Sequence, residues 1–534
     1  MQRRPRVAGV TVPLFSLRTR ASWGIGSISD LLPFAAWIAD AGITLIQLLP
    51  LAEGSGASAS PYAALSAFGI DPIYIDVERL PGFGEDRVSA LLDDHDRREL
   101  ASARASARVD YAVAGRLKRK VLRGAFDDFY ARESREQGEL GREFIEFMTK
   151  AAPWLDNLAV FRALKALHGG RAWWEWPAPL RDRHIDALAH AQAELEREIL
   201  FCKYQQWVAD RQWSAARAAL RRRGVELMGD LPFMVDRDSA DVWAHRDQFH
   251  MDMSVGVPAD QFDEDGQDWG MPPYHWEAMA LNGFAWLRRR CAHAGHLYDR
   301  FRIDHLVGFY RTYMRPLHRR RDARGMLVKG VFSSATELAQ RAHGEMVITA
   351  MIEGAASSGG ALIAEDLGSI PDYVHPSLAR LEVPGYKVLI WETAEDGSLR
   401  DPKTYPALSV ACFGTHDTDP VAVWWEGLVA KERAQVAALL GIPAAKAPKG
   451  FSPAIHEVLL RRILGARSEL VLLLMQDVLG TRERVNKPGT LGEHNWTYRL
   501  PASIEALAGD AGTAAKLAMV KAAVAAGQRR LPPG

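Results

Sequence analysis

Residues 301–305 read Phe-Arg-Ile-Asp-His, a short apolar run that ends in charged side chains. Because side chains alternate along a β-strand, Arg302 and Asp304 share one face of such a strand and Ile303 points to the other. Seven more short runs rich in apolar or β-branched residues occur along the chain, and most of them also end in polar residues. The eight predicted strands are residues 10–16, 45–51, 226–233, 301–306, 361–366, 387–392, 410–417 and 470–477.

Helix signals separate these runs. Ser29 and Asp30 precede the helix-like segment 31–41, and Gly42 lies just after its end. Strands that alternate with helices pair in parallel through right-handed crossovers, and eight such units close a (β/α)8 TIM barrel. We therefore predict an α/β fold of this kind, with catalytic groups at the C-terminal ends of the strands. A doubly wound open sheet is the alternative, but no Gly-x-Gly-x-x-Gly turn follows an early strand.

Two intervals interrupt the alternation of strands and helices. Residues 84–223 are rich in Ala, Leu, Arg and Glu at helical spacing, which predicts a large helical insertion between the second and third strands. Residues 234–283 predict a smaller substrate-loop subdomain after the third strand, and 504–526 predict the closing helix of the barrel. We expect residues 1–534 to form a single barrel, without a separate C-terminal β-sandwich domain.

Composition limits the classes of ligand. The chain has 534 residues, of which 48% are hydrophobic and 25% charged, as in an ordinary soluble globular protein. The 66 basic residues balance the 66 acidic ones, so no net field attracts the chain to nucleic acid or to an anionic membrane. We therefore predict no nucleic-acid or membrane partner, and a neutral substrate.

Cysteine usage and the N-terminus predict a cytoplasmic protein. Cys202, Cys291 and Cys412 are far apart and have no metal-ligand spacing, which predicts buried free thiols. The basic start, residues 1–6, is followed by an apolar segment too short for a signal peptide. The longest apolar run, 470–475, is far below the roughly 18 residues that a membrane span needs. No nucleotide or metal motif occurs, so we expect no cofactor.

Three predicted strand ends carry acids, namely Asp304, Glu365 and Asp417. Arg302 lies two residues from Asp304 and would favour its ionised form, although the pair alone is equally consistent with a structural ion pair. Glu365 and Asp366 point to opposite sides, so at most one of them enters the barrel mouth. Retaining glycosidases need a nucleophile and an acid/base about 5–5.5 Å apart, and neighbouring barrel strands can supply such a pair.

Aromatic side chains in loops are the expected partners of a sugar, because sugars have apolar ring faces. Each aromatic residue in such a loop is, taken singly, equally consistent with ordinary packing. The candidates in loop sequences that contain Pro or Gly are Tyr62, Trp173, Trp174, Trp176 and Trp269.

The sequence resembles the 4-α-glucanotransferases of the amylomaltase type, glycoside hydrolase family 77. The resemblance extends over nearly the whole chain, and its motifs occur in order. These motifs are Ser60-Pro61-Tyr62 with Ser66-Ala67-Phe68, Trp173-Trp174-Glu175-Trp176-Pro177, Gly229-Asp230-Leu231-Pro232-Phe233, Asp238-Ser239-Ala240-Asp241-Val242-Trp243, Gly266-Gln267-Asp268-Trp269-Gly270, Phe301-Arg302-Ile303-Asp304-His305, Ala364-Glu365-Asp366-Leu367-Gly368, Gly414-Thr415-His416-Asp417 and Gln476-Asp477-Val478-Leu479-Gly480.

The resemblance implies a role for each matching residue. Asp304 corresponds to the nucleophile that forms a covalent glucosyl-enzyme, and Glu365 to the general acid/base. Asp417 corresponds to the acid that binds the 2- and 3-hydroxyls of the sugar. The implied partners of these acids and substrate contacts are Arg302, His416, Asp230, Tyr62, Trp269 and Asp260.

The implied activity is transfer of α-1,4-glucan segments from maltooligosaccharides, starch or glycogen to the 4-hydroxyl of glucose or of another glucan. It proceeds by retaining double displacement and needs no cofactor. Four departures from the family pattern bear on acceptor preference and activity level. Leu306-Val307-Gly308 stands where Phe-Arg-Gly is usual, Ala259 replaces a Pro, and Thr418 replaces an Asn. The fourth departure is at residues 386–392, which read Tyr-Lys-Val-Leu-Ile-Trp-Glu where Met-Lys-Val-Leu-Gln-Phe is commoner.

Three other functions compete with this one. An α-glucan hydrolase would use the same site with water as acceptor. A metal-dependent barrel hydrolase would need more ligands than His305 and His416 with their neighbouring acids, and the first predicted strand ends in Leu-Phe-Ser without a His-x-His. A non-catalytic glucan-binding protein would have no need of three acids at strand ends.

Overall fold

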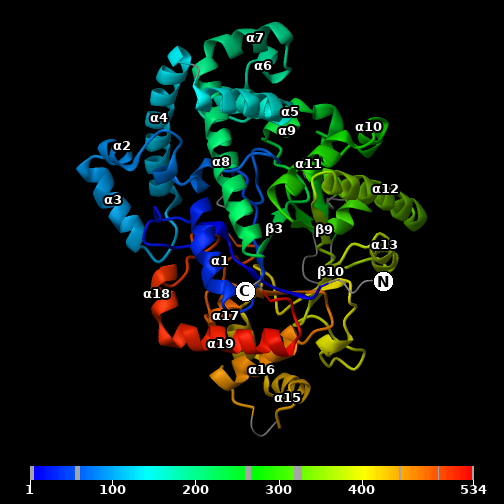
Figure 1. The fold of residues 1–534 in the computed structure, drawn as a ribbon. Coiled ribbons are helices and arrows are strands. Elements are labelled where there is room, and N and C mark those ends of the chain that lie inside the picture. Colours follow the sequence, from blue (N-terminus) through cyan, green and yellow to red (C-terminus); the bar gives the residue numbers. More distant parts are fainter. Residues whose placement is uncertain are drawn as a thin grey trace.

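The computed structural model describes residues 5–54, 60–136, 138–258, 266–317, 328–443, 447–490 and 492–531. Eight parallel strands close a barrel in the order β1-β12-β11-β10-β9-β6-β3-β2, which confirms the predicted (β/α)8 fold. Figure 1 labels β3, β9 and β10 of this barrel. The strands are β1 (Val7–Thr11), β2 (Leu45–Gln47), β3 (Glu226–Leu231), β6 (Arg300–Ile303), β9 (Ala361–Ala364), β10 (Gly385–Val388), β11 (Ser409–Cys412) and β12 (Leu470–Leu474).

The first strand differs from its prediction. β1 pairs with β12 from Val7 onward and ends at Thr11, whereas residues 10–16 were predicted. Pro13 cannot donate a ladder hydrogen bond, and a 3-10 helix over Leu14–Ser16 follows it instead of a strand. Each of the other seven strands begins within two residues of its predicted start.

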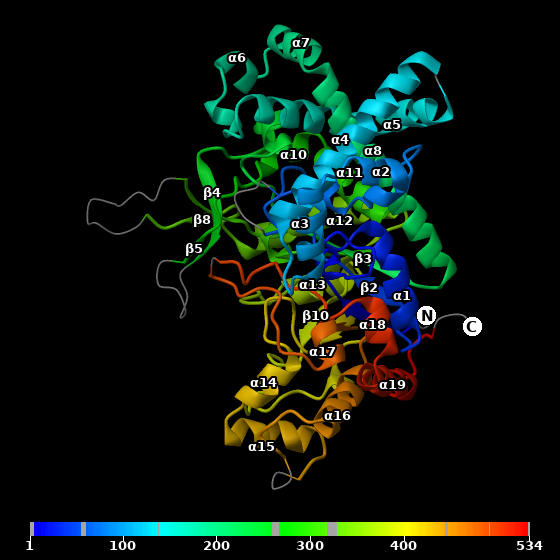
Figure 2. The same cartoon turned by 90° about the vertical axis from the view of Figure 1, so that its left-hand side faces the viewer.

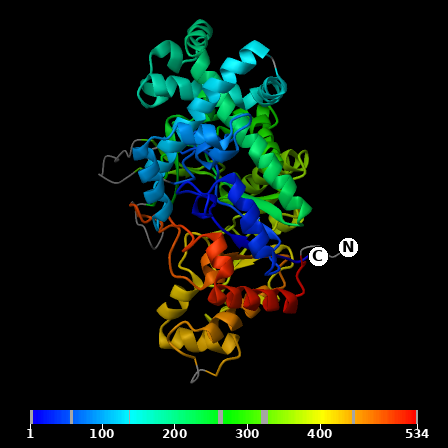
Figure 3. The ribbon, with the colours of Figure 1, turned by 60° about the vertical axis from the view of Figure 1, so that its left-hand side comes forward.

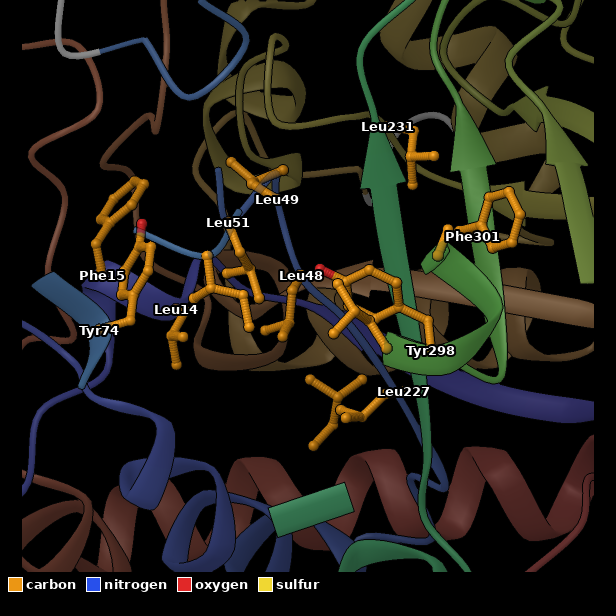
Figure 4. Close-up of a cluster of buried hydrophobic side chains, with 14 of the residues drawn as sticks. Leu14, Phe15, Leu48, Leu49, Leu51, Tyr74, Leu227, Leu231, Tyr298 and Phe301 are labelled. Atoms are coloured by element: carbon orange, nitrogen blue, oxygen red, sulfur yellow. The ribbon is translucent and has the colours of Figure 1, made fainter. Parts of the chain in front are cut away.

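Alternate side chains on the barrel strands form two cores. The inner core includes Leu45, Met228 and Leu472. A Cβ on Gly9 would lie 2.7 Å from Leu472 Cδ2, so only glycine fits at that level of the barrel. The outward side chains belong to the second core, between barrel and helices. Figure 4 shows part of this outer core, with Leu227 and Leu231 of β3 beside Tyr298, Phe301, Leu48, Leu49, Leu51, Leu14, Phe15 and Tyr74.

Helices cover the outside of the barrel. The predicted closing helix is interrupted, because the Asp510 side chain accepts a hydrogen bond from Thr513 N at 2.7 Å and starts a new helix. The C-terminal segment returns to the start of the chain (Figure 3). Arg529 there donates to the Val7 carbonyl at 3.2 Å. The helices of this layer and of the C-terminal part are α1 (Leu31–Ala39), α11 (Ala285–Leu297), α12 (Glu337–Ala356), α13 (Val374–Arg380), α14 (Val421–Gly427), α15 (Ala430–Leu439), α16 (Pro453–Leu464), α17 (Met475–Leu479), α18 (Ile504–Gly509) and α19 (Ala511–Ala526).

Seven α-helices lie between β2 and β3 in the described chain. Most of them gather at the top of Figure 1, and α8 runs from them down to the barrel wall, where it contacts α1. Its Trp213 is fully buried and donates to the Leu297 carbonyl at 2.8 Å, which ties α8 to the end of α11. The seven are α2 (Glu85–Ala90), α3 (Asp94–Ala105), α4 (Tyr111–Glu136), α5 (Glu139–Leu167), α6 (Ala178–Arg181), α7 (Ile185–Glu194) and α8 (Glu196–Arg222).

A small antiparallel sheet, in the order β5-β4-β7-β8, lies on the side of the molecule opposite to the two chain ends (Figure 2). Its strands are β4 (Met253–Val257), β5 (Gln267–Asp268), β7 (Tyr313–Pro316) and β8 (Val331–Phe332), and the short helices α9 (Ala240–Ala244) and α10 (Trp276–Leu281) lie near β4 in sequence.

Two other predictions concern the whole chain. Cys202, Cys291 and Cys412 are buried free thiols, as predicted. Among the described residues, no helix combines the length and the apolar character that crossing a membrane requires.

Candidate active site

Two carboxyl groups leave neighbouring strands at the same level of the barrel mouth. Asp304 directly follows β6 and Glu365 directly follows β9, and the parallel register places Ile303 opposite Ala364. Glu365 N donates to the Ile303 carbonyl at 3.0 Å, so the alignment continues past the strand ends. Neighbouring strands are about 4.7–4.9 Å apart, which suits the separation of about 5–5.5 Å in a retaining pair.

The backbone after β6 orients the Glu365 carboxyl. His305 has left-handed backbone geometry (φ 45°), and its N–H donates to Glu365 Oε2 at 2.7 Å. Leu367 N donates to the other carboxyl oxygen at 3.0 Å. With both oxygens held by backbone donors, the carboxyl group has one orientation in the mouth.

The two acids differ in their surroundings. Glu365 is buried, whereas the Asp304 side chain is 31% exposed. Burial raises the pKa of Glu365 to about 7, against the opposing effect of Arg302, and the charge of Asp304 adds to the rise. Glu365 can therefore hold a proton near neutral pH, as a general acid must.

Arg302 joins Asp304 to a third carboxylate. Its Nη2 donates to Asp304 Oδ1 at 2.7 Å, and its Nη1 donates to Asp230 Oδ1 and Oδ2 at 2.7 and 2.9 Å. Arg302 and Asp230 are both buried, and they come from the paired strands β6 and β3. Arg302 therefore forms a buried ion pair with Asp230 and also holds the Asp304 carboxylate in place.

A second set of contacts continues from Asp230 across the mouth. The Tyr62 hydroxyl donates to Asp230 Oδ2 at 2.7 Å, and it lies 3.0 Å from His416 Nε2. Because a hydroxyl has one hydrogen, His416 must donate its Nε2 hydrogen to the Tyr62 oxygen. The same His416 nitrogen lies 3.4 Å from Asp417 Oδ2. The rings of Tyr62 and His416 stack with their centroids 5.6 Å apart. One chain of polar contacts therefore runs from Asp304 to Asp417.

Asp417 is held from the far side by residues that sequence reasoning missed. Asn486 Nδ2 donates to Asp417 Oδ1 at 2.6 Å, and Arg484 contacts the Asp417 carbonyl and donates to Asp419 at 2.9 Å. The Trp496 ring packs against the Tyr62 ring, with the two centroids 5.8 Å apart. All three lie after β12, and a position beyond the C-terminal end of a barrel strand is the signal that could have identified them.

The aromatic residues predicted to contact a sugar differ in their positions and burial. Trp269 lies beside His305, the residue after Asp304, with the two ring centroids 5.0 Å apart and the rings nearly perpendicular. Trp173 and Trp176 are buried away from the acids: Trp173 donates to the Arg237 carbonyl, and Trp176 packs on Trp243. Packing is therefore their observed role.

Trp174, Asp260 and the departures from the family pattern are the remaining predicted features. Trp174 is 42% exposed and packs edge-on against Trp173. Asp260 lies outside the described residues. Leu306 and Val307 are buried in the 3-10 helix that follows Asp304, so both apolar side chains pack into the core. Thr418 donates to the Thr415 carbonyl at 3.0 Å, inside its own turn.

Residues 12–504 match the protein family described as 4-alpha-glucanotransferase. The chain belongs to this family. A 4-alpha-glucanotransferase of Thermus thermophilus is 33% identical over 515 residues, which cover 93% of this chain and 95% of that protein. The corresponding protein of Chlamydia pneumoniae is 31% identical, over 94% and 92% of the two chains.

Solved structures agree with the family assignment. The amylomaltase from Streptococcus agalactiae, in complex with acarbose, superposes with a TM-score of 0.80 at 25% identity, over 98% of this chain and all of that one. The amylomaltase from Corynebacterium glutamicum has the same fold, with a TM-score of 0.78 at 23% identity over 98% and 75% of the two chains. The resemblance to this family and the predicted barrel are both confirmed.

Asp230→Asn is expected to lower the free energy of unfolding by about 3 kcal/mol, the lower end of the range for breaking a buried ion pair, because Arg302 keeps Asp304 as a partner. Urea unfolding at neutral pH measures the loss. Glu353→Gln is the matched control, since it removes one charge from an exposed pair with Arg288 and should cost less than about 1 kcal/mol. Equal losses in the two variants would contradict a stabilising role for the buried pair.

Proposed function

We propose that this chain transfers segments of α-1,4-glucan from maltooligosaccharides, starch or glycogen to the 4-hydroxyl of glucose or of another glucan. One observation carries the proposal. A buried, protonatable Glu365 stands one strand away from the partly exposed Asp304, whose carboxylate Arg302 holds. Such a pair can protonate a leaving oxygen and attack the anomeric carbon of the same sugar.

In the first displacement, Glu365 gives its proton to the glycosidic oxygen while Asp304 attacks the anomeric carbon. The bond between that carbon and the glycosidic oxygen breaks, and the fragment with the reducing end leaves. The donor segment is then an ester of Asp304, with its anomeric configuration inverted.

In the second displacement, Glu365 is a carboxylate and acts as a base. It takes the proton from the 4-hydroxyl of the acceptor, whose oxygen attacks the anomeric carbon and releases Asp304. The second inversion gives overall retention, and the enzyme returns to its starting protonation state.

Asp417 is proposed to bind the 2- and 3-hydroxyls of the sugar that reacts. Asn486 and His416 contact both of its carboxylate oxygens, which supports a fixed carboxylate at the mouth. Its hydrogen bonds should strengthen as the ring flattens toward an oxocarbenium ion, so its loss should reduce kcat more than substrate binding.

The substrate contacts are proposed to be Tyr62, Trp269 and Asp260, with Arg302 and His416 beside the acids. Asp230, which the resemblance implies as a further contact, has a fully buried side chain and is proposed to act by positioning Arg302 and Tyr62. Trp269 belongs to the 234–283 segment and lies against His305, which supports a role for this subdomain in holding the donor chain.

We also propose that the enzyme is cytoplasmic, because its three cysteines are unpaired, as is usual where thiols stay reduced.

Product analysis from maltotriose tests the proposal. The purified protein should produce glucose together with maltopentaose and longer oligosaccharides, and added glucose should shift the products toward shorter chains. Glucose and maltose alone, with no chain longer than the substrate, would show that water is the acceptor and would overturn the proposal.

The rate of transfer is expected to fall as pH rises through about 7, because Glu365 must be protonated for the first displacement and its pKa lies there. Initial rates of maltotriose disproportionation between pH 5 and 9 check this. The proton is bound below the pKa and lost above it, so the decline belongs on the alkaline side. A rate that stays constant from pH 6 to pH 9 would contradict the assignment of Glu365 as the acid.

A further inference from the structure

Two histidines and a glutamate meet where the turn before β4 touches the start of α10. His250, His275 and Glu277 each offer one ligand atom, and these three atoms lie within 4.8 Å of one another. The imidazole rings of the two histidines have centroids 4.5 Å apart. Neither histidine belongs to the polar contacts of the catalytic acids described above.

The backbone holds both histidines in place. His250 N donates to the Pro273 carbonyl and His275 N donates to the Gln248 carbonyl, each at 2.8 Å. Between these bonds, Phe249 and Tyr274 form an antiparallel bridge, and their rings pack together in the core. The two side chains therefore start from a rigid pair of segments, which is what a preformed ligand set requires.

The hydrogen bonding of His275 leaves one ring nitrogen free to bind a cation. Its Nδ1 lies 3.2 Å from the Asp247 carbonyl, which can only accept, so Nδ1 carries the hydrogen. The lone pair is then on Nε2, which lies 3.9 Å from Glu277 Oε2. Histidines that bind metals commonly donate their other nitrogen to a backbone carbonyl in this way.

We propose that His250, His275 and Glu277 bind a divalent transition metal ion, with Zn²⁺ as the best match. Two imidazole nitrogens and one carboxylate oxygen, with water as the fourth ligand, are a common tetrahedral zinc set. At metal–ligand distances of about 2.0–2.2 Å, tetrahedral ligand atoms lie about 3.3 Å apart, so the three groups must close slightly around the ion. Glu277 is 78% exposed and has the rotamer freedom to do this.

The ion would have a structural role. It would join the turn that leads into β4 to the first turn of α10, and so stabilise the start of β4, which pairs with β5 directly before Trp269. Asp304, Glu365 and Asp417 are not among the ligands, so the double displacement does not use the ion. This inference stands apart from the proposed transfer activity, and either can fail without the other.

Zinc titration of the untagged full-length protein, after removal of metal with a chelator, tests the site. Calorimetry should detect one high-affinity equivalent of Zn²⁺, and zinc should raise the Tm by a few degrees, because a ligand that binds the folded state stabilises it. The double variant His250→Ala/His275→Ala should lose this equivalent and the rise in Tm. Glu277→Gln, a change at an exposed position, should weaken binding about tenfold or more.

His190→Ala is the matched control, since His190 forms an exposed pair with Glu194 and has the same ligand types in a two-residue arrangement. It should bind zinc like the unmodified protein. If the His250/His275 variant and Glu277→Gln both bind zinc as tightly as this control, the site is wrong. Far-UV circular dichroism of the metal-free variants measures whether they are folded. If the double variant is unfolded, the zinc affinity of Glu277→Gln alone tests the site.

Discussion

Asp304→Asn is expected to reduce the rate of glucan transfer by roughly 10⁴-fold or more. An amide cannot form the glycosyl ester, and no other described carboxylate takes its place one strand from Glu365. The side chain keeps its shape, and Arg302 keeps its buried bonds to Asp230, so the variant should remain folded. Chromatography of maltotriose reactions over minutes to days covers the required range of rates.

Two controls accompany this measurement. Asp304→Ala excludes residual activity from slow deamidation of the new asparagine, since alanine cannot revert. Asp127→Asn neutralises an exposed carboxylate paired with Arg197 and should leave the rate unchanged. If Asp304→Asn disproportionates maltotriose as fast as the unmodified protein, Asp304 is not the nucleophile and the double displacement is wrong.

Glu365→Gln is expected to slow transfer from maltotriose by about 10²- to 10⁴-fold, because the leaving oxygen no longer receives a proton. A maltosyl fluoride donor should behave differently, since fluoride leaves without protonation. Its first displacement should stay within about tenfold of the unmodified rate, an order-of-magnitude expectation for a step that needs no general acid. The comparison of the two donors therefore isolates the proton donor.

The second displacement gives an independent measurement on the same variant. Without a base to activate the acceptor, the ester of Asp304 should accumulate, and intact-protein mass spectrometry should show the added mass of the maltosyl group. Azide, an anion that needs no base, should release it as a glycosyl azide. Equal losses with both donors, and no covalent adduct, would contradict the role of Glu365.

The strands of the barrel were predictable because their signal is local. Alternation and polar ends are properties of five or six consecutive residues, and seven of the eight strand starts were placed within two residues. The first strand starts earlier than predicted, at Val7, and it ends at Thr11 because Pro13 lies inside an otherwise apolar run. The predicted closing helix is divided in two because Asp510 serves as a helix cap. Both signals were present in the sequence, but the apolar pattern outweighed them.

The candidate site was predictable only in part, because some of its contacts are not local. The motif residues Asp304 and Glu365 stand at strand ends, where the pattern points. Asn486 reaches Asp417 across a separation of 69 positions, and no periodicity encodes that contact. Trp173 and Trp176 have the composition of a sugar platform, but their burial is decided by the packing of helices that come from elsewhere in the chain.

The division of Arg302 between two carboxylates has an electrostatic consequence. Its Nη1 faces the buried Asp230 and only Nη2 faces Asp304, so much of the guanidinium charge is compensated inside the wall. The acidic groups Asp304 and Asp417 remain at the opening, so we expect a negative potential there although the chain as a whole carries no net charge. A sugar ring gains positive charge only in the transition state, so a negative potential stabilises the transition state more than the neutral ground state. A cyclic amine of the same shape, protonated at neutral pH, carries that charge permanently and should bind here more tightly than the sugar it imitates.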